Sequence, residues 1–556
     1  MSGRIANRRI RLLLAVFALV FGLTLLRAVW LQGVRAQSLG RIAAKQHRQT
    51  LTVPAGRGAI YDRTGVQLAL GESSTTVYAD PLQIRDPVRV APVVARILRM
   101  DPKDVYEKLS DRSHGFVYIR RKADPAKAAR LAKRGIVGLG FYPEERRFYP
   151  QHSIAAQVLG YVGVDNRGLA GLELTLDKQL AGRAGRETIV RDPLGHVLES
   201  VSSAPAVDGS DVYLTIDHTI QAQAESVLRS TVERWHAKDA TATVLDPRTG
   251  AVLAMAVAPT YDANNFPDVP RDEQRNRAVT DTYEPGSTFK LVTVAGALST
   301  GIVTPGDSFV LPYEIQVADR KIHDAEPRGT ERMTVAQILS RSSNVGAITL
   351  ARLLGKDRLV SWISRFGFGR PTGIDYPGES RGIVLRADDW SGSTIGNVPI
   401  GQGIAVTPVQ LASAYAAIAN GGVWTRPHVV ERVGGAAREP IVRRRIVRRW
   451  IATQLTSMLR NVVLDGTGTL AQVPGYHVAG KTGTAAKPDA HGGYSDSKYV
   501  ASFVGFVPAS RPRIVVLVTV DEPHGAIWGG AVAAPAFRQI AEPTLQYLDV
   551  PPDSRS

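Results

Sequence analysis

The longest apolar stretch of the chain lies close to its N-terminus. No charged residue occurs from Leu12 to Leu26, and Arg27 is followed by a second apolar run, Ala28 to Leu31. About 20 helical residues at roughly 1.5 Å each span a hydrocarbon core of about 30 Å. The pattern therefore predicts one membrane-spanning helix, with Arg27 near its far end, where a long side chain can reach the lipid interface.

The charges that flank this helix predict its orientation. Four arginines precede it, at positions 4, 8, 9 and 11, and positive residues on a short leading segment keep that segment in the cytoplasm. We expect residues 1–11 to be a cytoplasmic tail, 12–32 to be a signal anchor, and the rest to lie outside the cell (inner) membrane, in the periplasm. The alternative is a cleaved signal peptide, but no A-x-A site follows the apolar run.

Shorter apolar and polar alternations follow the anchor. Residues 33–50 are polar and favour a helical stalk, whereas 57–65 indicate a strand and then a turn. Amphipathic helices are predicted near 87–110 and 124–134. This mixture indicates an elongated α/β pedestal domain, which we place at 33–210.

The remaining pattern predicts a second domain at 211–549, with a tail at 550–556. Asp217 is an expected cap for a helix that runs to about Trp235. Two apolar runs, 242–245 and 252–257, flank a turn sequence and predict a hairpin. Further strands are expected at 503–507 and 514–520, and helices near 287–299, 334–354 and 407–420. Strands at both ends with helices between them indicate an α+β fold whose antiparallel sheet is closed by its first and last strands.

Composition narrows the function classes. The chain has 556 residues, which is too long for one hydrophobic core. Its net charge is +17, but no aromatic-plus-basic motif or zinc-finger spacing accompanies that charge, so we do not expect a nucleic-acid partner. The charge fits a surface near anionic lipid or an anionic cell-wall polymer. Cysteine is absent, which excludes a disulfide framework and a thiolate nucleophile.

The first candidate catalytic motif is Ser287-Thr288-Phe289-Lys290, which follows Glu284-Pro285-Gly286. Ser287 is expected at a helix start, and the spacing places Lys290 on the same helix face. Partial burial lowers the pKa of a lysine, which can then take the proton of a serine nucleophile. A chain of this length contains about one S-x-x-K by chance. A second occurs at Ser495 to Lys498, in a Gly- and Asp-rich loop, and we interpret it as coincidence.

Two further motifs follow in the chain. Ser342-Ser343-Asn344 is the only S-x-N and lies where one helical stretch ends and the next begins; capping alone would also explain such residues. Lys481-Thr482-Gly483-Thr484 follows the strand-like run 476–480. A glycine in an edge strand lets another backbone approach, so an extended peptide can pair there, with Lys481 on its terminal carboxylate. The alternative is an ordinary strand that contains glycine.

The ordered S-x-x-K, S-x-N and K-T-G motifs resemble those of penicillin-binding proteins and serine β-lactamases. Over its whole length the chain resembles a class B penicillin-binding protein. The pedestal motifs that carry this resemblance are Arg57-Gly58 through Asp62-Arg63, Arg147-Phe148-Tyr149-Pro150, Gly168, Gly171 and Glu173. In the second domain they are Gly401-Gln402-Gly403, Thr407-Pro408 and Gln410. Leu291 departs from the pattern, because proline is common after the motif lysine.

The resemblance implies a serine D,D-transpeptidase that cross-links peptidoglycan stem peptides and needs no metal or other cofactor. Ser287 would attack the penultimate D-Ala carbonyl and release the last D-Ala, with Lys290 as general base. Ser342 would relay a proton to the leaving amine, and Asn344 would hold Lys290 and the substrate amide. Backbone N–H groups of Ser287 and Thr484 would form the oxyanion hole, in a substrate-binding strand made by Lys481, Thr482, Gly483 and Thr484. β-Lactams would acylate Ser287.

Within class B, the S-x-N and K-T-G motifs resemble the division (septal) type more than the elongation type, which often carries S-x-D and K-S-G. The resemblance also implies a membrane glycan polymerase and other division proteins as partners. A β-lactamase, a membrane β-lactam sensor and an inert scaffold are the alternatives. The anchor and pedestal argue against the first, the short cytoplasmic tail against the second, and the intact Ser287, Lys290 and Lys481 against the third.

Overall fold

The computed structural model describes residues 2–35, 48–191, 197–436, 442–489 and 491–554. These residues form two compact units. The first contains residues up to Gly56 together with Gly182–Gly209, and the second contains Arg57–Ala181 together with Ser210–Ser556.

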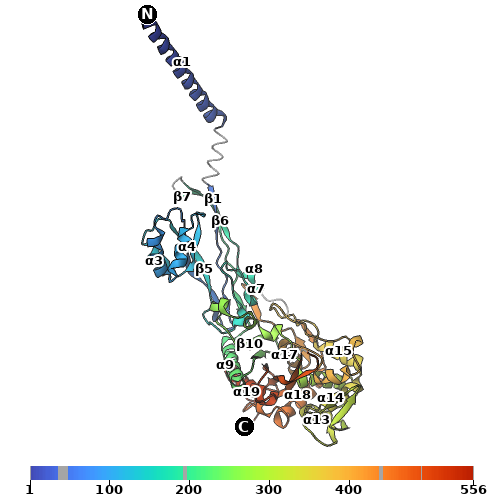
Figure 1. Ribbon diagram of the computed structural model, residues 1–556. Coiled ribbons are helices and arrows are strands. Elements are labelled where there is room, and N and C mark those ends of the chain that lie inside the picture. The colour runs from blue at the N-terminus through green and yellow to red at the C-terminus, as the bar shows by residue number, and fades with distance from the viewer. Residues whose placement is uncertain (1, 36–47, 192–196, 437–441, 490, 555–556) are drawn as a thin grey trace. The chain divides into compact units, whose positions relative to one another are not determined.

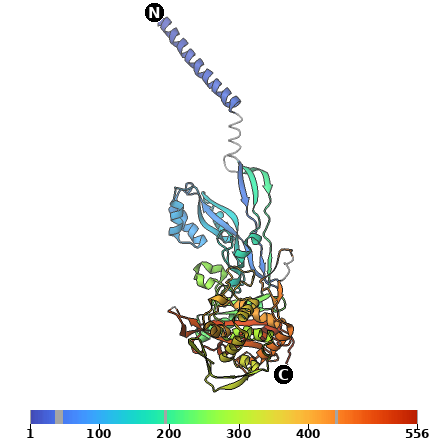
Figure 2. The ribbon, with the colours of Figure 1, turned by 90° about the vertical axis from the view of Figure 1, so that its right-hand side faces the viewer.

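The first unit contains the apolar helix and a small sheet (Figure 1). Helix α1, Ser2–Val29, continues into a π turn, Trp30–Val34. Of the described residues, one segment is long and apolar enough to cross a membrane, Asn7–Gly33, and its side chains are exposed. Strands β1 (Arg48–Val53), β6 (Gly185–Arg191) and β7 (Val197–Ala204) form an antiparallel sheet in the order β1-β6-β7 (Figure 2). The predicted stalk helix is therefore wrong for residues 48–50, which pair as a strand, and 36–47 lie outside the described residues.

The second unit begins with a sheet in the order β16-β8-β2-β3-β4, with β5 also paired to β3. Its strands are β2 (Ile60–Tyr61), β3 (Gln67–Ala79), β4 (Val117–Ala123), β5 (Leu139–Phe148), β8 (Val212–Leu214) and β16 (Val430–Val433). Helices α3 (Pro87–Leu98), α4 (Pro102–Ser110) and α5 (Pro125–Ala132) pack with Val77, Ala79 and Ile119 in a separate core. Aspartates cap all three helices, and proline occupies their first positions.

A buried charge cluster includes Arg147, a residue of β5. Glu173 is fully buried and accepts hydrogen bonds from Arg57 Nε at 2.8 Å and Arg147 Nε at 2.6 Å. It lies in the short helix α7 (Gly171–Thr175), which is flanked by α6 (Ala156–Leu159) and α8 (Asp177–Leu180). Arg57, Arg147 and Glu173, which carry part of the pedestal resemblance, therefore form one ion-pair cluster. This pairing explains how the buried charges are tolerated.

Strand β8 is shared by two parts of the second unit. It pairs in parallel with β2, from the predicted pedestal, and antiparallel with β16, from the predicted catalytic domain. The boundary predicted at 210 falls just before this shared strand, and it stays a prediction.

The catalytic part is built on a five-stranded antiparallel sheet in the order β10-β9-β20-β19-β18. The strands are β9 (Asp239–Leu245), β10 (Val252–Ala258), β18 (Ala479–Pro488), β19 (Tyr494–Val507) and β20 (Ile514–Asp521). The first hairpin pairs with the last strand, as predicted, because β9 lies beside β20. Strand β18 lies at the sheet's edge.

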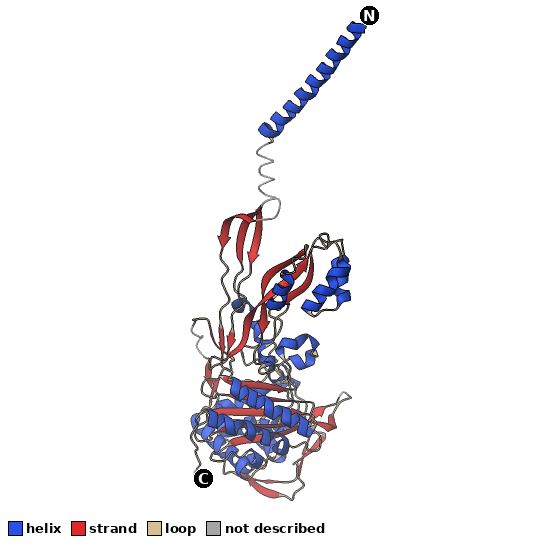
Figure 3. Cartoon of the chain, turned by 90° about the vertical axis from the view of Figure 1, so that its left-hand side faces the viewer, coloured by secondary structure: helices blue, strands red, loops and turns tan. Residues whose placement is uncertain are grey.

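Helices cover both faces of this sheet (Figure 3). One face packs on α9 (His218–Trp235) and α19 (Gly529–Tyr547) in a core that includes Val244, Phe503 and Val518. The other face, with Val504 and Leu517, belongs to a larger core shared with the central helices. These helices are α12 (Lys290–Ser299), α13 (Val335–Ser340), α14 (Asn344–Leu354), α15 (Lys356–Phe366), α17 (Pro408–Ala419) and α18 (Arg449–Leu464). The α+β fold with helices on an antiparallel sheet is confirmed.

The remaining elements are short. Two ribbons, β11 (Ser308–Leu311) with β14 (Glu331–Thr334) and β12 (Glu314–Val317) with β13 (Arg320–His323), connect α12 to α13. A third ribbon pairs β15 (Val423–Thr425) with β17 (Arg443–Arg445). The single turns are α10 (Arg271–Gln274), α11 (Arg277–Thr280), α16 (Thr394–Asn397), and 3-10 turns at Ala263–Asp268, Gly286–Phe289, Ala387–Asp389, Val398–Ile400 and Thr469–Ala471.

Candidate active site

The candidate nucleophile Ser287 lies in the 3-10 turn Gly286–Phe289, directly before α12. We expected a helix-capping serine, but no side-chain cap bond is made at either helix start. The hydroxyl is instead half-buried and accepts a hydrogen bond from Lys290 Nζ at 3.0 Å. It is therefore free of a capping role and coupled to the lysine.

Lys290 lies at the centre of the site, with 1% of its surface exposed. Besides Ser287, its Nζ donates to Asn344 Oδ1 at 2.7 Å and to Ser342, at 2.5 Å for the carbonyl and 3.2 Å for the hydroxyl. Burial lowers the pKa of Lys290 to about 7, although the nearby Asp324 carboxylate acts in the opposite direction. An amine with that pKa is available as a base near neutral pH.

The S-x-N motif lies between α13 and α14. Ser343 is the N-cap of α14, and its hydroxyl accepts from Gly346 N at 2.9 Å. Ser342 has a positive φ of 61°. A non-glycine residue in that conformation costs about 1–3 kcal/mol and persists where the surroundings impose it. The conformation is accompanied by contacts from both the carbonyl and the hydroxyl of Ser342 to Lys290.

The K-T-G motif lies on the edge strand β18, which begins at Ala479. The Lys481 side chain is fully buried, and its Nζ donates to Ser342 Oγ at 2.9 Å and to Thr482 Oγ1 at 3.2 Å. Burial, and then the charge of Lys290, hold the pKa of Lys481 well below its usual range. Both lysines therefore contact the same Ser342 hydroxyl, which can pass a proton between groups on either side.

Glycines allow the nucleophile turn to lie against β18. A Cβ on Gly483 would come within 2.8 Å of Pro285 O and 2.3 Å of Ser502 Oγ. A Cβ on Gly286, whose φ is positive, would lie 2.8 Å from Thr484 O. The backbone that approaches Gly483 is thus that of residues 285–286, directly before Ser287. This close approach brings Ser287 near Thr484.

The second S-x-x-K does not form a comparable pair. The Ser495 hydroxyl accepts from the backbone N–H groups of Ser497 and Lys498 in a local turn. Lys498 Nζ lies 4.0 Å from Glu522 Oε2. The geometry agrees with the interpretation of this motif as coincidence.

Two residues that sequence reasoning did not single out support the site. Glu284 Oε1 accepts from Gly403 N at 3.0 Å and from Tyr494 OH at 3.2 Å, which connects the segment before Ser287 to Gly403 and to the first residue of β19. Asp324 is buried and accepts from Asn344 N at 2.6 Å. The only sequence signal for Glu284 is its place before Pro285; for Asp324, which is distant in sequence from the motifs, there is none.

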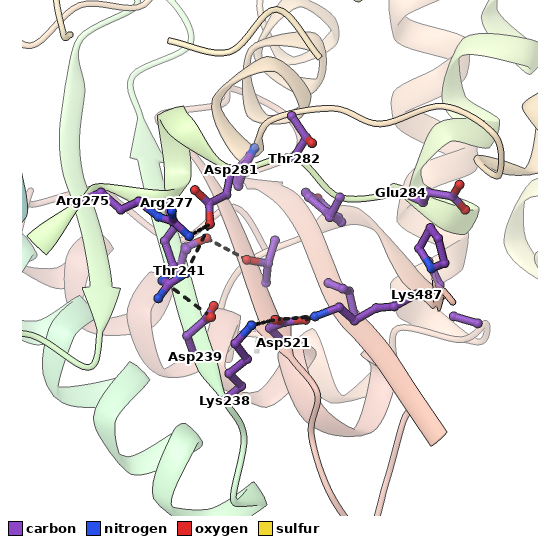
Figure 4. Close-up of a pocket in the computed structure, with 17 residues that line it drawn as sticks. Lys238, Asp239, Thr241, Arg275, Arg277, Asp281, Thr282, Glu284, Lys487 and Asp521 are labelled. Carbon is purple, nitrogen blue, oxygen red and sulfur yellow. Dashed lines mark hydrogen bonds and ion pairs between the residues drawn. The ribbon is translucent and has the colours of Figure 1, made fainter. Parts of the chain in front are cut away.

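A cavity of about 210 Å³ lies behind the nucleophile segment, at the ends of β9, β18 and β20 (Figure 4). Its charged side chains pair with one another: Arg277 with Asp281 at 3.2 Å, and Lys487 with Asp521 at 2.8 Å. Burial raises the pKa of Asp239 to about 6, although Arg277 Nε lies 3.6 Å away. We interpret these ion pairs as holding the strand ends together.

Among the described residues, one group of potential metal ligands occurs, Asp62, Asp217 and His218, whose ligand atoms lie within 4.8 Å of one another. Its carboxylates already accept N–H donors. Asp62 Oδ1 accepts from Val66 N and its Oδ2 from His218 Nδ1, whereas Asp217 Oδ1 caps α9 through Thr219 N. These hydrogen bonds connect the end of β2 to the start of α9, so we interpret the group as structural.

The sheet, the Ser287–Lys290 pair and the glycine-containing edge strand form an arrangement suited to acyl transfer through a serine. Comparison with known proteins identifies the family. The profile of the penicillin-binding protein transpeptidase domain matches residues 240–542, and that of the penicillin-binding protein dimerisation domain matches 52–214. The chain belongs to the penicillin-binding protein transpeptidase family, and this pair of domains makes it a class B member. Its enzyme class is peptidoglycan D,D-transpeptidase.

Relatives match over almost the full length. The chain is 33% identical to the peptidoglycan D,D-transpeptidase FtsI of Escherichia coli, over 98% of this chain and 93% of FtsI. It is also 33% identical to the stage V sporulation protein D of Bacillus subtilis, over 99% of this chain and 88% of that protein. A crystal structure of penicillin-binding protein 3 from Mycobacterium tuberculosis, complexed with aztreonam, superimposes with a TM-score of 0.73 at 32% identity, over 91% of this chain and 98% of that one.

Proposed function

We propose that this transpeptidase cross-links stem peptides through an acyl-enzyme on Ser287, in cell-wall synthesis at the division septum. The observation that carries the assignment of Ser287 is the network around Lys290 Nζ, which reaches the hydroxyls of Ser287 and Ser342 and the amide of Asn344. The other serine–lysine motif lacks such a network.

In this mechanism Lys290 removes the Ser287 proton as the hydroxyl attacks the penultimate D-Ala carbonyl. The proton passes through Ser342 to the leaving D-Ala amine, because the Ser342 hydroxyl contacts both lysines. The acyl-enzyme is then attacked by an amine of a neighbouring strand. The N–H groups of Ser287 and Thr484 stabilise the oxyanion, and Thr482 and Gly483 belong to the edge that receives the peptide backbone.

β-Lactams would acylate the same serine. The Mycobacterium tuberculosis protein is described in complex with aztreonam and with ampicillin, and this chain shares its fold. A transpeptidase holds the adduct for a long time, whereas a β-lactamase hydrolyses it, so the deacylation rate separates the two.

The septal assignment rests on the S-x-N and K-T-G types and on the likeness to FtsI. We place the catalytic part outside the cell membrane, because four arginines precede the single apolar helix. A membrane glycan polymerase would be the working partner. A fluorescent fusion expressed in the native host should gather at the septum, and selective inhibition should give filaments. Lateral-wall labelling and rounded cells would indicate an elongation enzyme instead.

Mass spectrometry after penicillin labelling tests the chemistry. Ser287→Ala should show no covalent adduct at an unchanged melting temperature, whereas Ser495→Ala, in the second motif, should be labelled like the wild type. An adduct that persists in Ser287→Ala would overturn the assignment.

A further inference from the structure

The carboxylate of Asp324, which lies outside the three motifs, forms hydrogen bonds with the S-x-N segment. Asp324 directly follows β13 and is 6% exposed. Its Oδ1 accepts from Asn344 N at 2.6 Å and from Val345 N at 3.0 Å, and both its oxygens contact Ser343 Oγ, at 3.1 and 3.0 Å. One carboxylate therefore holds three successive residues, beginning directly after Ser342.

The same short segment also orients the amide of Asn344. Asn344 Nδ2 donates to the carbonyl of His323 at 2.8 Å, so Oδ1 is the atom that faces Lys290 Nζ, at 2.7 Å. Residues 323 and 324 thus fix the backbone of Asn344 and the direction of its side chain.

Asp324 is itself anchored. Arg328 donates to Asp324 Oδ2 from Nε at 2.9 Å and from its terminal nitrogen at 2.5 Å. Arg328 also donates to Leu311 O at 2.9 Å, at the end of β11. Both Arg328 donors reach the same oxygen, and the carboxylate tolerates burial because it is fully hydrogen-bonded.

Helix capping alone does not account for this arrangement. Ser343 already caps α14 through Gly346 N, and the capped helix begins at Asn344, two residues after the strained Ser342. The energy that holds Ser342 at its positive φ must come from its surroundings, and Asp324 supplies contacts directly after that residue.

We propose that Asp324, anchored by Arg328, is a positioning residue that holds Ser342 and Asn344 against Lys290. The proposal rests on the proposed role of Ser287 and Lys290. The carboxylate also acts on Lys290 by its charge, in the direction that keeps the lysine protonated. Lys481 Nζ also contacts Ser342 Oγ, and a positive charge on Lys481 would act in the opposite direction.

The test compares the acylation rate of Asp324→Asn and the wild type across pH, with a penicillin as the probe. The variant should acylate about tenfold more slowly or worse at its plateau, because reacting groups that are slightly misplaced lose rate steeply. The rise of the rate with pH should move to lower pH, because loss of the negative charge lowers the pKa of Lys290. A capping role would lower the melting temperature and leave both kinetic features unchanged.

Glu331→Gln is the matched control. Glu331 Oε1 lies 3.5 Å from Arg328 Nε, so the control also removes a carboxylate beside Arg328. Glu331 Oε2 accepts from Arg341 at 2.9 Å, directly before the motif, but among the described hydrogen bonds Glu331 has none to Ser342, Ser343 or Asn344. It should behave like the wild type. Equal loss in both variants, or an Asp324→Asn variant with the wild-type plateau and pH dependence, would overturn the proposal.

Arg328→Gln provides a second measurement if Asp324→Asn does not fold. It leaves the Asp324 charge without its counter-ion, so the pKa of Lys290 should rise and the rate profile should move to higher pH. No shift, or a shift to lower pH, would contradict the proposal. If the wild type itself fails to form an adduct on Ser287, the proposed function fails first, and the two failures are thereby distinguished.

Discussion

At the scale of single residues, Lys290 and Lys481 lie in one site, where burial removes both side chains from water. Lys290 and Lys481 are each almost fully buried, and both donate to Ser342 Oγ. Two ammonium groups so placed destabilise each other's charge. A site of this kind favours one neutral amine, and Lys290, the lysine that contacts Ser287, is well placed to be that base.

The rate of acylation should therefore follow the titration of Lys290. With a pKa of about 7, the neutral base is scarce at pH 6 and predominant at pH 8. The second-order rate constant should rise about tenfold per pH unit in the acid limb and level off above the pKa. Stopped-flow acylation with a chromogenic β-lactam measures the profile. A rate that is flat from pH 6 to 8 would contradict the assignment of Lys290 as base.

Substitution of the two lysines should separate their roles. Lys481→Ala should lower the acylation rate constant about tenfold or more, since a charged hydrogen bond to a substrate carboxylate contributes about 1.5–3 kcal/mol. Lys290→Ala should be far slower, because the base itself is lost. Lys487→Ala, on the same strand but paired with Asp521, is the control and should stay within about twofold of the wild type. If Lys481→Ala acylated like this control, Lys481 would be only a strand residue.

At the scale of elements, the position of Ser287, the proposed nucleophile, depends on how closely its turn approaches β18. Pro285 O would lie 2.8 Å from a Cβ at position 483, and Ser502 Oγ 2.3 Å from it. Both contacts are shorter than a carbon atom tolerates, and the first is with backbone, which cannot rotate away. The turn can thus pack this closely against β18 only because position 483 has no side chain.

Gly483→Ala should consequently push the nucleophile turn away from β18. We expect an acylation rate at least about tenfold lower, because the oxyanion donors and Ser287 are separated, and a loss of about 1–3 kcal/mol in stability from overpacking. Gly492→Ala, in the β18–β19 connection, tests for a general effect of alanine; a Cβ there meets nothing within 4 Å, although its φ of 92° adds strain. Acylation by Gly483→Ala at the wild-type rate would show that the turn does not need this approach.

The elements that the sequence predicted well are those with a local signal. Asp217 does cap α9, and the predicted hairpin is β9–β10. The stalk was misjudged at residues 48–50, because their pairing with β6 joins residues more than 130 positions apart, and local polarity carries no trace of it. The contacts of Asp324 and Glu284 could not be predicted for the same reason, because folding brings their partners near and no fixed spacing in the sequence marks them.

At the scale of the whole molecule, the apolar helix α1 and the candidate active site belong to different compact units. The second unit has its own cores on both faces of the catalytic sheet, and the described residues that form these cores all belong to that unit. The pedestal residues 57–181 belong to the catalytic unit, where buried ion pairs such as Arg57–Glu173 hold them. A truncation should therefore spare the pedestal and remove only the helix.

Removal of residues 1–34 should give a protein that stays in solution and still acylates. The exposed apolar surface of α1 is lost, while β1, with β6 and β7, is retained. Sedimentation should leave the truncated chain in the supernatant without detergent, and its acylation rate constant should match the detergent-solubilised full chain within about threefold, a difference of under 1 kcal/mol. Ser287→Ala in the truncated chain supplies the negative control. A truncated protein with an unchanged melting temperature but no acylation would mean that the membrane segment helps to build the site, against the independence of the two units.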